Sequence, residues 1–188
     1  MSLMSQTTKR ALAASLKQLL IHKPLSKITV TDITEDCEVN RHTFYYHFQD
    51  IYDLIDWIYE TEMEKVIADN KTYETWADGV RALFQYALDN KTFITNTYHS
   101  LSRKDLMRFL NQTTYQFLID VVNEQAQGMK VDQKHKEFIA NFYKHAFVGL
   151  ALEWIEGNMK RNPDEIIQDL TTLIEGDFHK ALLRFEER

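Results

Sequence analysis

The stretch from Ile28 to Phe48 constrains the fold of this chain more than any other part of the sequence. It reads as two short helices that are separated by a tight turn. Thr29, with Asp32 three residues later, has the pattern of a capping box at the start of the first helix. Asn40 is a second N-cap residue and begins the next helix. Five apolar side chains are spaced to lock the two helices at an angle: Ile33, Cys37, Val39, Phe44 and Phe48.

The second of these helices begins with a polar turn. Arg41, His42 and Thr43 follow the cap directly, and we expect them to be exposed. In a helix-turn-helix, the start of the second helix contacts base edges in the major groove of DNA. The stretch therefore predicts a DNA-reading unit.

Apolar residues recur at helical spacing along nearly the whole chain, and strand-like alternation is absent. Only two prolines and five glycines occur among 188 residues, so breaks are few. These patterns predict an all-α fold with about nine helices. We expect a three-helix helix-turn-helix domain at residues 1–49 and a helical regulatory and dimerisation domain at residues 50–188. The helices expected outside 28–48 cover residues 5–22, 51–69, 75–89, 91–100, 103–127, 132–160 and 163–186.

The net charge of −6 divides unevenly along the chain. Residues 1–48 hold six lysines and arginines against four acidic residues, which leaves +2 there and −8 in the remainder. DNA binding needs local positive charge to neutralise phosphates and does not need a positive total. In the first predicted helix, Lys9, Arg10 and Lys17 lie outside the apolar face, where they either approach phosphates or are simply solvated.

Several function classes are disfavoured. The sequence has no run of eighteen apolar residues, no signal-peptide pattern and a single cysteine, Cys37, which excludes an intrachain disulfide. We therefore expect a cytoplasmic protein with no membrane partner. It also lacks a His-Glu-x-x-His motif, a cysteine cluster and a glycine-rich phosphate loop, and His42 and His47 are poorly spaced for one metal. We expect no enzymatic activity, no metal site and no cofactor.

The segments Ile28–Ile33 and Asn40–Phe48, the latter with a Thr-Phe-Tyr-x-His-Phe run, closely resemble the N-terminal domain of the TetR family of bacterial regulators. The resemblance implies phosphate contacts by three residues of the second helix and groove contacts by three others. The phosphate contacts fall on Thr43, Tyr46 and His47, and the groove contacts on Arg41, His42 and Tyr45. The complete predicted DNA-binding set is Thr29, Thr31, Arg41, His42, Thr43, Tyr45, Tyr46 and His47.

Three features depart from the family pattern. The turn has Cys37–Val39 where the family often has Ala-Gly-Val, and a left-handed Glu38 would cost about 1 kcal/mol relative to glycine. Gln49–Ile51 stands where a lysine commonly follows the His-Phe pair, so one expected phosphate contact is missing or reassigned. The acidic residues Glu35, Asp36 and Glu38 lie close to the reading helix, where they are either solvated or repel off-target DNA.

The last two predicted helices carry more apolar surface than the core of one small domain needs. A helix that is apolar on two faces is either central to its own core or shared with a partner. The family resemblance implies a homodimer in which both pairs of helices form a four-helix bundle. Two heads about 34–36 Å apart would then read successive major grooves. The predicted interface comprises Phe138, Phe142, Gly149, Leu150, Trp154, Ile167, Leu170, Ile174 and Phe178.

Aromatic residues of the predicted regulatory domain, residues 50–188, suggest an apolar cavity with a few polar groups in its wall. Such a cavity would bind a small apolar or amphipathic effector. This expectation comes mainly from the family resemblance, and for any single residue ordinary core packing is the more frequent role. The predicted pocket residues are Trp57, Phe84, Tyr86, Phe93, Tyr98, Tyr115, Phe142 and His145.

The arrangement from Phe138 to Trp154, followed by Glu156–Met159, resembles a subgroup whose members include regulators of dihydroxyacetone kinase genes. At least one member acts as a coactivator with a partner protein. The family resemblance implies a ligand-responsive repressor that binds a palindromic operator as a homodimer. The alternative is a coactivator or adaptor with weak DNA binding of its own. The net charge of only +2 in residues 1–48 and the absence of a lysine after the His-Phe pair favour this alternative.

Overall fold

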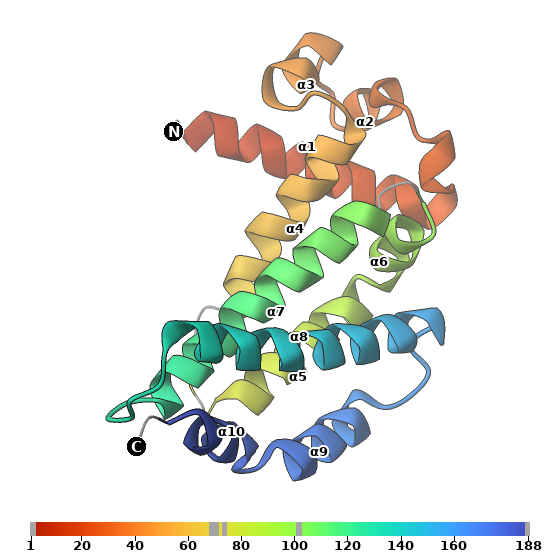
Figure 1. Cartoon of the computed structure of the whole chain (residues 1–188). Helices are drawn as coiled ribbons and strands as arrows, with labels where there is room; N and C mark the ends of the chain where they lie inside the picture. The colour runs from red at the N-terminus through yellow and green to blue at the C-terminus, as the bar shows by residue number, and fades with distance from the viewer. Residues whose placement is uncertain (1–2, 68–71, 73–74, 101–102, 187–188) are drawn as a thin grey trace. The chain divides into compact units, whose positions relative to one another are not determined.

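A computed structural model describes residues 3–67, 72, 75–100 and 103–186 of the chain. Within these ranges every regular element is helical, and no β-strand occurs (Figure 1). The predicted all-α fold is confirmed. The elements are α1 (Leu3–His22), the 3-10 turn η1 (Leu25–Lys27), α2 (Val30–Asp36), α3 (Arg41–His47), α4 (Ile51–Ile67), α5 (Trp76–Asp89), α6 (Lys91–Tyr98), α7 (Arg103–Gln125), α8 (Gln133–Glu156), α9 (Pro163–Ile174) and α10 (Asp177–Phe185).

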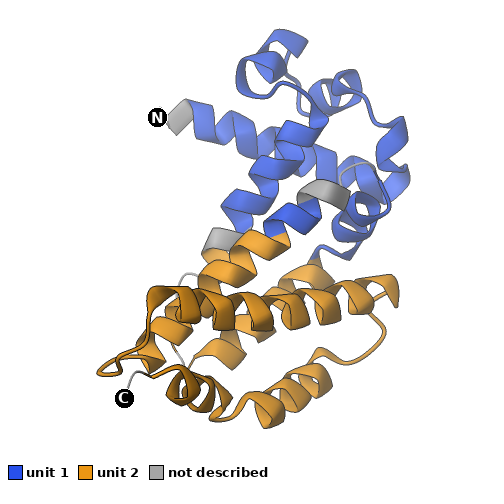
Figure 2. Ribbon diagram, viewed as in Figure 1, with its two compact units in different colours: residues 1–62, 90–109 blue, residues 63–89, 110–188 orange. Residues whose placement is uncertain are grey.

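The chain divides into two compact units (Figure 2). The first comprises residues 1–62 and 90–109, and the second comprises residues 63–89 and 110–188. Helices α4 and α7 therefore contribute residues to both units. No helix in the described ranges is both long enough and apolar enough to cross a membrane.

The first unit is built around α1, which packs against α2, α3 and α6. Its centre consists of side chains with no exposed surface, including Leu12, Leu16 and Ile33. Further along the chain, the ring of Tyr59 stacks on Phe109 at 5.3 Å between ring centroids, and the Tyr59 hydroxyl hydrogen-bonds the buried Thr97 hydroxyl. The core of this unit thus combines the helix-turn-helix with α6 and the first residues of α7.

Lys17 does not lie free on the surface of α1. Its ammonium group forms an ion pair with Glu62 of α4, at 2.5 Å from one carboxylate oxygen, and donates to the Asn90 side-chain oxygen at 2.8 Å. It also stands 5.3 Å from the ring centroid of Phe93 in α6. Lys17 therefore ties α1 to α4 and α6, and its predicted place on the outer face of α1 is wrong.

The second unit packs α5 against α9 and α8 against α10. Aromatic pairs fill the spaces between helices, because large rings bury much apolar area per residue. Phe84 and Trp154 meet edge to face at 4.7 Å between centroids, and Tyr143 lies 4.6 Å from Phe178. The Trp154 indole N–H donates to the Arg161 carbonyl at 2.8 Å, so this buried polar group is satisfied.

The predicted start of the helix at Asn162 is confirmed, since the Asn162 side chain accepts from the backbone N–H of Asp164 at 3.0 Å and Pro163 is the first helical residue. The prediction of a single helix over residues 163–186 is wrong. It breaks at Gly176, which has a φ of 73°, so α9 and α10 are separate helices. Glycine adopts this left-handed conformation at little cost, and the break raises the expected nine helices to ten α-helices in the described ranges.

Candidate nucleic-acid interface

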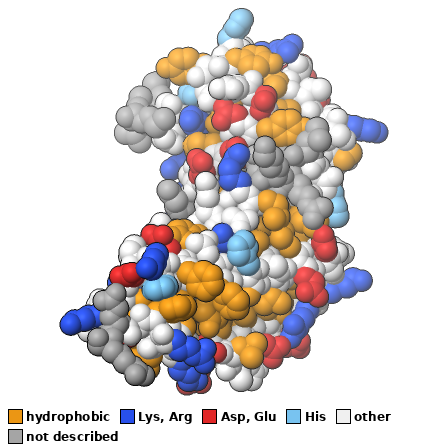
Figure 3. Space-filling view, viewed as in Figure 1, with side chains coloured by type: hydrophobic (Ala, Val, Ile, Leu, Met, Phe, Trp, Pro, Cys, Tyr) orange, Lys and Arg blue, Asp and Glu red, His pale blue; other side chains and the backbone are white. Residues whose placement is uncertain are grey.

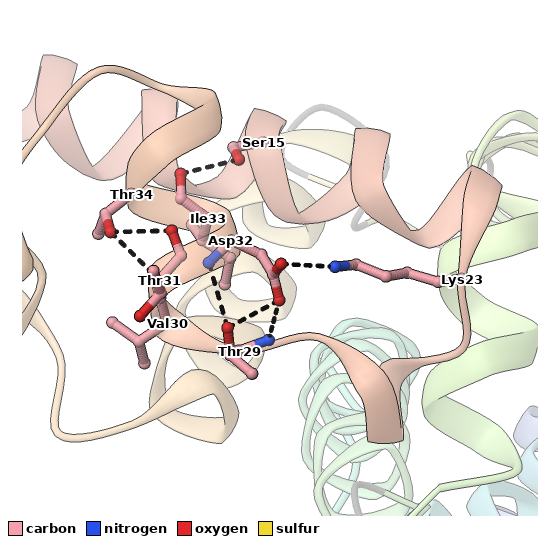
Figure 4. A network of polar contacts seen from close by, with 8 residues as sticks. All are labelled: Ser15, Lys23, Thr29, Val30, Thr31, Asp32, Ile33 and Thr34. Carbon is pink, nitrogen blue, oxygen red and sulfur yellow. Dashed lines mark hydrogen bonds and ion pairs between the residues drawn. The ribbon is translucent and has the colours of Figure 1, made fainter.

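The first helix of the helix-turn-helix begins at the predicted capping box (Figure 4). The Asp32 backbone N–H donates to the Thr29 hydroxyl oxygen at 3.2 Å, and the Thr29 backbone N–H donates to the Asp32 carboxylate at 2.7 Å. Lys23 adds an ion pair with the second Asp32 oxygen at 2.7 Å. The Ser15 hydroxyl donates to the Ile33 carbonyl at 3.1 Å and so fastens α2 to α1. The start of α2 is thus fixed from both sides.

The Asp32 carboxyl has a pKa lowered to about 2 from its ordinary value of 3.8, chiefly by the hydrogen bond from Lys23 and then by Thr29. Because the folded pKa lies below the unfolded one, this carboxylate stabilises the folded state above about pH 4, and the contribution is lost as pH falls towards about 2. We expect Asp32→Asn to lower the thermal midpoint at neutral pH and to approach wild type in acid. Thermal denaturation at several pH values measures this.

Lys23→Met is the matched variant for this prediction, because it removes the largest cause of the lowered Asp32 pKa. Its deficit should narrow over the same acid range. A deficit of either variant that stays constant from neutral pH to pH 2 would show that the Asp32 charge contributes nothing.

The turn between α2 and α3 places Glu38 at a φ of 55°. This is the left-handed conformation for which a cost relative to glycine was expected from the sequence. The backbone N–H of Val39 donates to the Thr34 carbonyl at 2.9 Å, and that of Glu38 donates to the Glu35 carbonyl at 3.3 Å. These two bonds form a Schellman motif, which usually has glycine at the left-handed position. The turn is therefore well bonded but carries local strain at Glu38.

We expect Glu38→Gly to stabilise the chain by about 1 kcal/mol, because glycine adopts the left-handed conformation without a Cβ clash. Equilibrium denaturation in urea measures the change. Glu35→Gly removes the same charge from within α2 and should instead destabilise by about 0.5–1 kcal/mol. A lower stability of Glu38→Gly than of wild type would contradict the account of the turn.

Helix α3 begins at Asn40, whose side-chain oxygen accepts from the Thr43 backbone N–H at 2.9 Å. One side of the helix is anchored by Phe44, which has no exposed surface, and by Phe48 at the end of the helix, which is 3% exposed. The opposite side is open: Tyr45 is 51% exposed and Tyr46 is 83% exposed. Burial of large aromatic side chains on one side thus holds the other side towards solvent.

All eight predicted DNA-binding residues lie in the first unit, at the start of α2 or along α3. Arg41 and His42 are exposed in the first turn of α3, whereas Thr31, Thr43 and His47 are half-buried. Burial, with a smaller contribution from Lys9, lowers the pKa of His47 below its ordinary value of 6.5. The neutral form of the imidazole is therefore favoured. Helix α3 thus presents exposed hydrogen-bonding side chains, and its buried aromatic side chains hold it firmly in place.

Residues 74–176 match a family model of the TetR type that is described as a transcriptional regulator C-terminal region. The match covers more than half of the chain. This chain belongs to the TetR family. The resemblance carried by Ile28–Phe48 is thereby confirmed, and with it the expectation of a DNA-binding transcriptional regulator. TetR-family regulators bind DNA and act as dimers.

Individual relatives agree with this assignment. A dhaKLM operon transcriptional activator from Lactococcus lactis, DhaS, is 31% identical over 86 residues, which cover 46% of this chain and 46% of that protein. A solved structure of the dihydroxyacetone kinase operon activator DhaS matches 96% of this chain and 98% of its own, with a TM-score of 0.74 and 22% identity. NalD, described as a secondary repressor of the MexAB-OprM efflux pump in Pseudomonas aeruginosa, covers 100% of this chain and 99% of its own, with a TM-score of 0.57 and 14% identity. The structural likenesses extend the TetR-family fold to nearly the whole chain.

The residues predicted for an effector pocket fall in both units of this TetR-family chain. Trp57, Phe93 and Tyr98 belong to the first unit, where Trp57 lies 5.9 Å from Phe48 between ring centroids. The others lie in the second unit, and within it Phe142 is 64% exposed. A cavity of about 260 Å³ in the second unit has other residues in its wall: Leu150, Glu153, Trp154, Gly157, Lys160, Arg161 and Ile166.

The predicted dimer interface divides by burial. Phe138 and Phe142, one turn apart on α8, are 60% and 64% exposed, and Gly149 is also exposed. On the face shown in Figure 3, hydrophobic side chains gather along α8 in the second unit. Five other predicted residues are at most 6% exposed within the single chain, so they are core residues with little surface to offer a partner. These buried positions are Trp154, Ile167, Leu170, Ile174 and Phe178.

Proposed function

We propose that this TetR-family chain reads a palindromic operator as a homodimer, with one copy of α3 in the major groove of each half-site. The observation that carries the proposal is the open face of α3, where Arg41 and Tyr45 are exposed while Phe44 is fully buried. An arginine pairs well with guanine edges, and phenol, imidazole and hydroxyl groups donate to phosphates. The other predicted contacts lie at the start of α2 and along α3.

We propose that the chain acts as a repressor that releases DNA when a small apolar or amphipathic effector binds to it. An effector that binds more tightly when the two helix-turn-helix units have a spacing unlike that of the operator half-sites would shift the population towards that spacing. The dimer would then no longer fit the operator. The cavity of about 260 Å³ in the second unit, whose wall includes Leu150, Trp154 and Ile166, supports such a site. We expect no enzymatic reaction to accompany binding, and we place this action in the bacterial cytoplasm, where the operator lies.

The interface proposed for the homodimer uses the exposed part of α8. Phe138 and Phe142 are large apolar side chains that are more than half exposed in the single chain. Two copies related by a twofold axis would cover both side chains at once, because such an interface presents the same patch from each subunit. Gly149 on the same helix leaves room for a close approach.

Binding of the purified chain to the promoter DNA beside its own gene tests the proposed function. Fluorescence anisotropy with a labelled promoter fragment and an excess of scrambled competitor separates specific from non-specific binding. We expect specific binding that survives the competitor. Equal binding of promoter and scrambled DNA would contradict an operator-reading function.

A second candidate function is that of a coactivator or adaptor that acts through a partner protein. Two observations favour it: residues 1–48 carry a net charge of only +2, and the relative DhaS is described as an activator. The same anisotropy measurement discriminates the two functions. Tight, sequence-selective binding by the chain alone would exclude the adaptor, whereas selective binding that requires an added partner would exclude the independent repressor.

A further inference from the structure

The basic side chains of the first unit differ in whether an acid already neutralises them. Lys17 is paired with Glu62, and Lys23 is paired with Asp32. The ammonium group of Lys9 in α1 instead lies over two aromatic rings, 5.0 Å from the centroid of Phe48 and 5.6 Å from that of Trp57. Its full positive charge therefore remains available to an outside anion.

These rings place Lys9 at the end of the reading helix. Phe48 caps α3 at its C-terminal end, and the ring of His47 lies 6.3 Å from the ring of Phe48. The positive charge of Lys9 is close enough to contribute to the lowered pKa of His47. The imidazole of His47 and the ammonium of Lys9 thus lie beside the same ring, that of Phe48.

The start of α4 offers no comparable site, because its own carboxylates occupy it. The Asp50 side chain accepts from the backbone N–H groups of Tyr52 and Asp53 at 2.8 and 2.9 Å. The Asp53 side chain accepts from the Gln49 N–H at 2.9 Å. These bonds use the amide donors that a helix start could present to a phosphate, and they put two negative charges there. Any cation that neutralises phosphate at this end of α3 has to come from another helix.

We propose that Lys9 binds a DNA phosphate beside the C-terminal end of α3, and this inference rests on the proposed operator-reading function. The rings of Phe48 and Trp57 hold the ammonium in place before DNA arrives, so less side-chain freedom is lost on binding. An ammonium group binds phosphate as a point charge and carries no information on base sequence. Lys9 therefore contributes affinity and salt dependence, and α3 contributes specificity.

The salt dependence of operator binding tests the role of Lys9. The logarithm of the binding constant falls with the logarithm of salt concentration by about 0.9 for each phosphate contact. In a homodimer, Lys9→Met removes two such contacts, so the slope should become less steep by about 1.8 while the preference for operator over scrambled DNA stays the same. Lys9→Arg keeps the positive charge and should retain the wild-type slope.

Lys130→Met is the matched control, because it removes the same charge from an exposed position in the second unit and should leave the slope unchanged. Thermal denaturation of each variant verifies that the fold is retained. A wild-type slope in Lys9→Met, in a protein that binds its operator selectively, would overturn the role of Lys9 alone. Absence of selective binding by wild type would instead overturn the proposed function on which this role rests.

Discussion

Replacing both Arg41 and Tyr45 by alanine should weaken operator binding by several hundredfold at a fixed salt concentration. A good bidentate pair between a side chain and a base edge contributes about 1–3 kcal/mol of discrimination, and we take its lower value for each of the two side chains. A homodimer loses four contacts, so even the lower value amounts to about 4 kcal/mol, and each 1.4 kcal/mol corresponds to about tenfold in affinity. Fluorescence anisotropy with the promoter fragment measures the loss.

The fold should survive this double substitution, because Arg41 is exposed, Tyr45 is 51% exposed, and the anchoring side chain Phe44 is left in place. Thermal denaturation checks this. Arg184→Ala, an exposed change of the same charge in the second unit, should bind the operator like wild type. Equal affinity of wild type and the double variant would mean that α3 is not the reading helix.

The second large effect is expected from Phe142→Glu in α8. A twofold interface repeats each substitution, so this change would place two negative charges in the apolar contact. We expect the variant to be monomeric by light scattering. Its operator affinity should fall by about 10²–10⁴, because joining two reading heads raises the affinity of the second contact by such factors.

Phe142 is suited to this test because it is 64% exposed in the single chain, so a charge there does not disrupt the chain's own core. Ile21→Glu adds the same charge at an apolar side chain of α1 that is 59% exposed, and this control should remain dimeric. Charges at Leu170 or Ile174 would be a poor test, since both side chains are almost fully buried and the variants would unfold. A dimeric Phe142→Glu protein would place the interface elsewhere.

The helix-turn-helix was predictable because its determinants are local in sequence. The capping box of Thr29 and Asp32 and the cap at Asn40 each join residues three positions apart, so residue types and spacing are sufficient to recognise them. The start of α9 at Asn162 and Pro163 was predictable for the same reason.

Contacts between distant residues were not predictable from the pattern. Lys17 has the spacing of an outward residue on α1, but Glu62 and Asn90 come to it from 45 and 73 positions away. The position of Lys9 over Phe48 and Trp57 depends in the same way on how α1 packs against other helices. Periodicity gives the face of a helix and does not give the partner that covers it.

Burial also separates residues that sequence treats alike. Ile167, Leu170 and Phe142 all have apolar side chains on predicted interface helices, yet the first two lie in the core of the chain and the third lies on its surface. The break at Gly176 makes α10 a separate helix, in which Phe178 and Leu182 are nevertheless buried. A single glycine in a long apolar pattern does not reveal such a break.

Hydroxyl-radical footprinting of the wild-type complex on its promoter tests most directly that two copies of α3 read the operator. Two protected patches on one face of the duplex are expected, with centres separated by about 10–10.5 base pairs or a multiple of that spacing. The patches should lie over the two halves of a palindrome, and Arg41→Ala/Tyr45→Ala should remove both. A single unsymmetrical patch, or protection that persists in the double variant, would contradict the account.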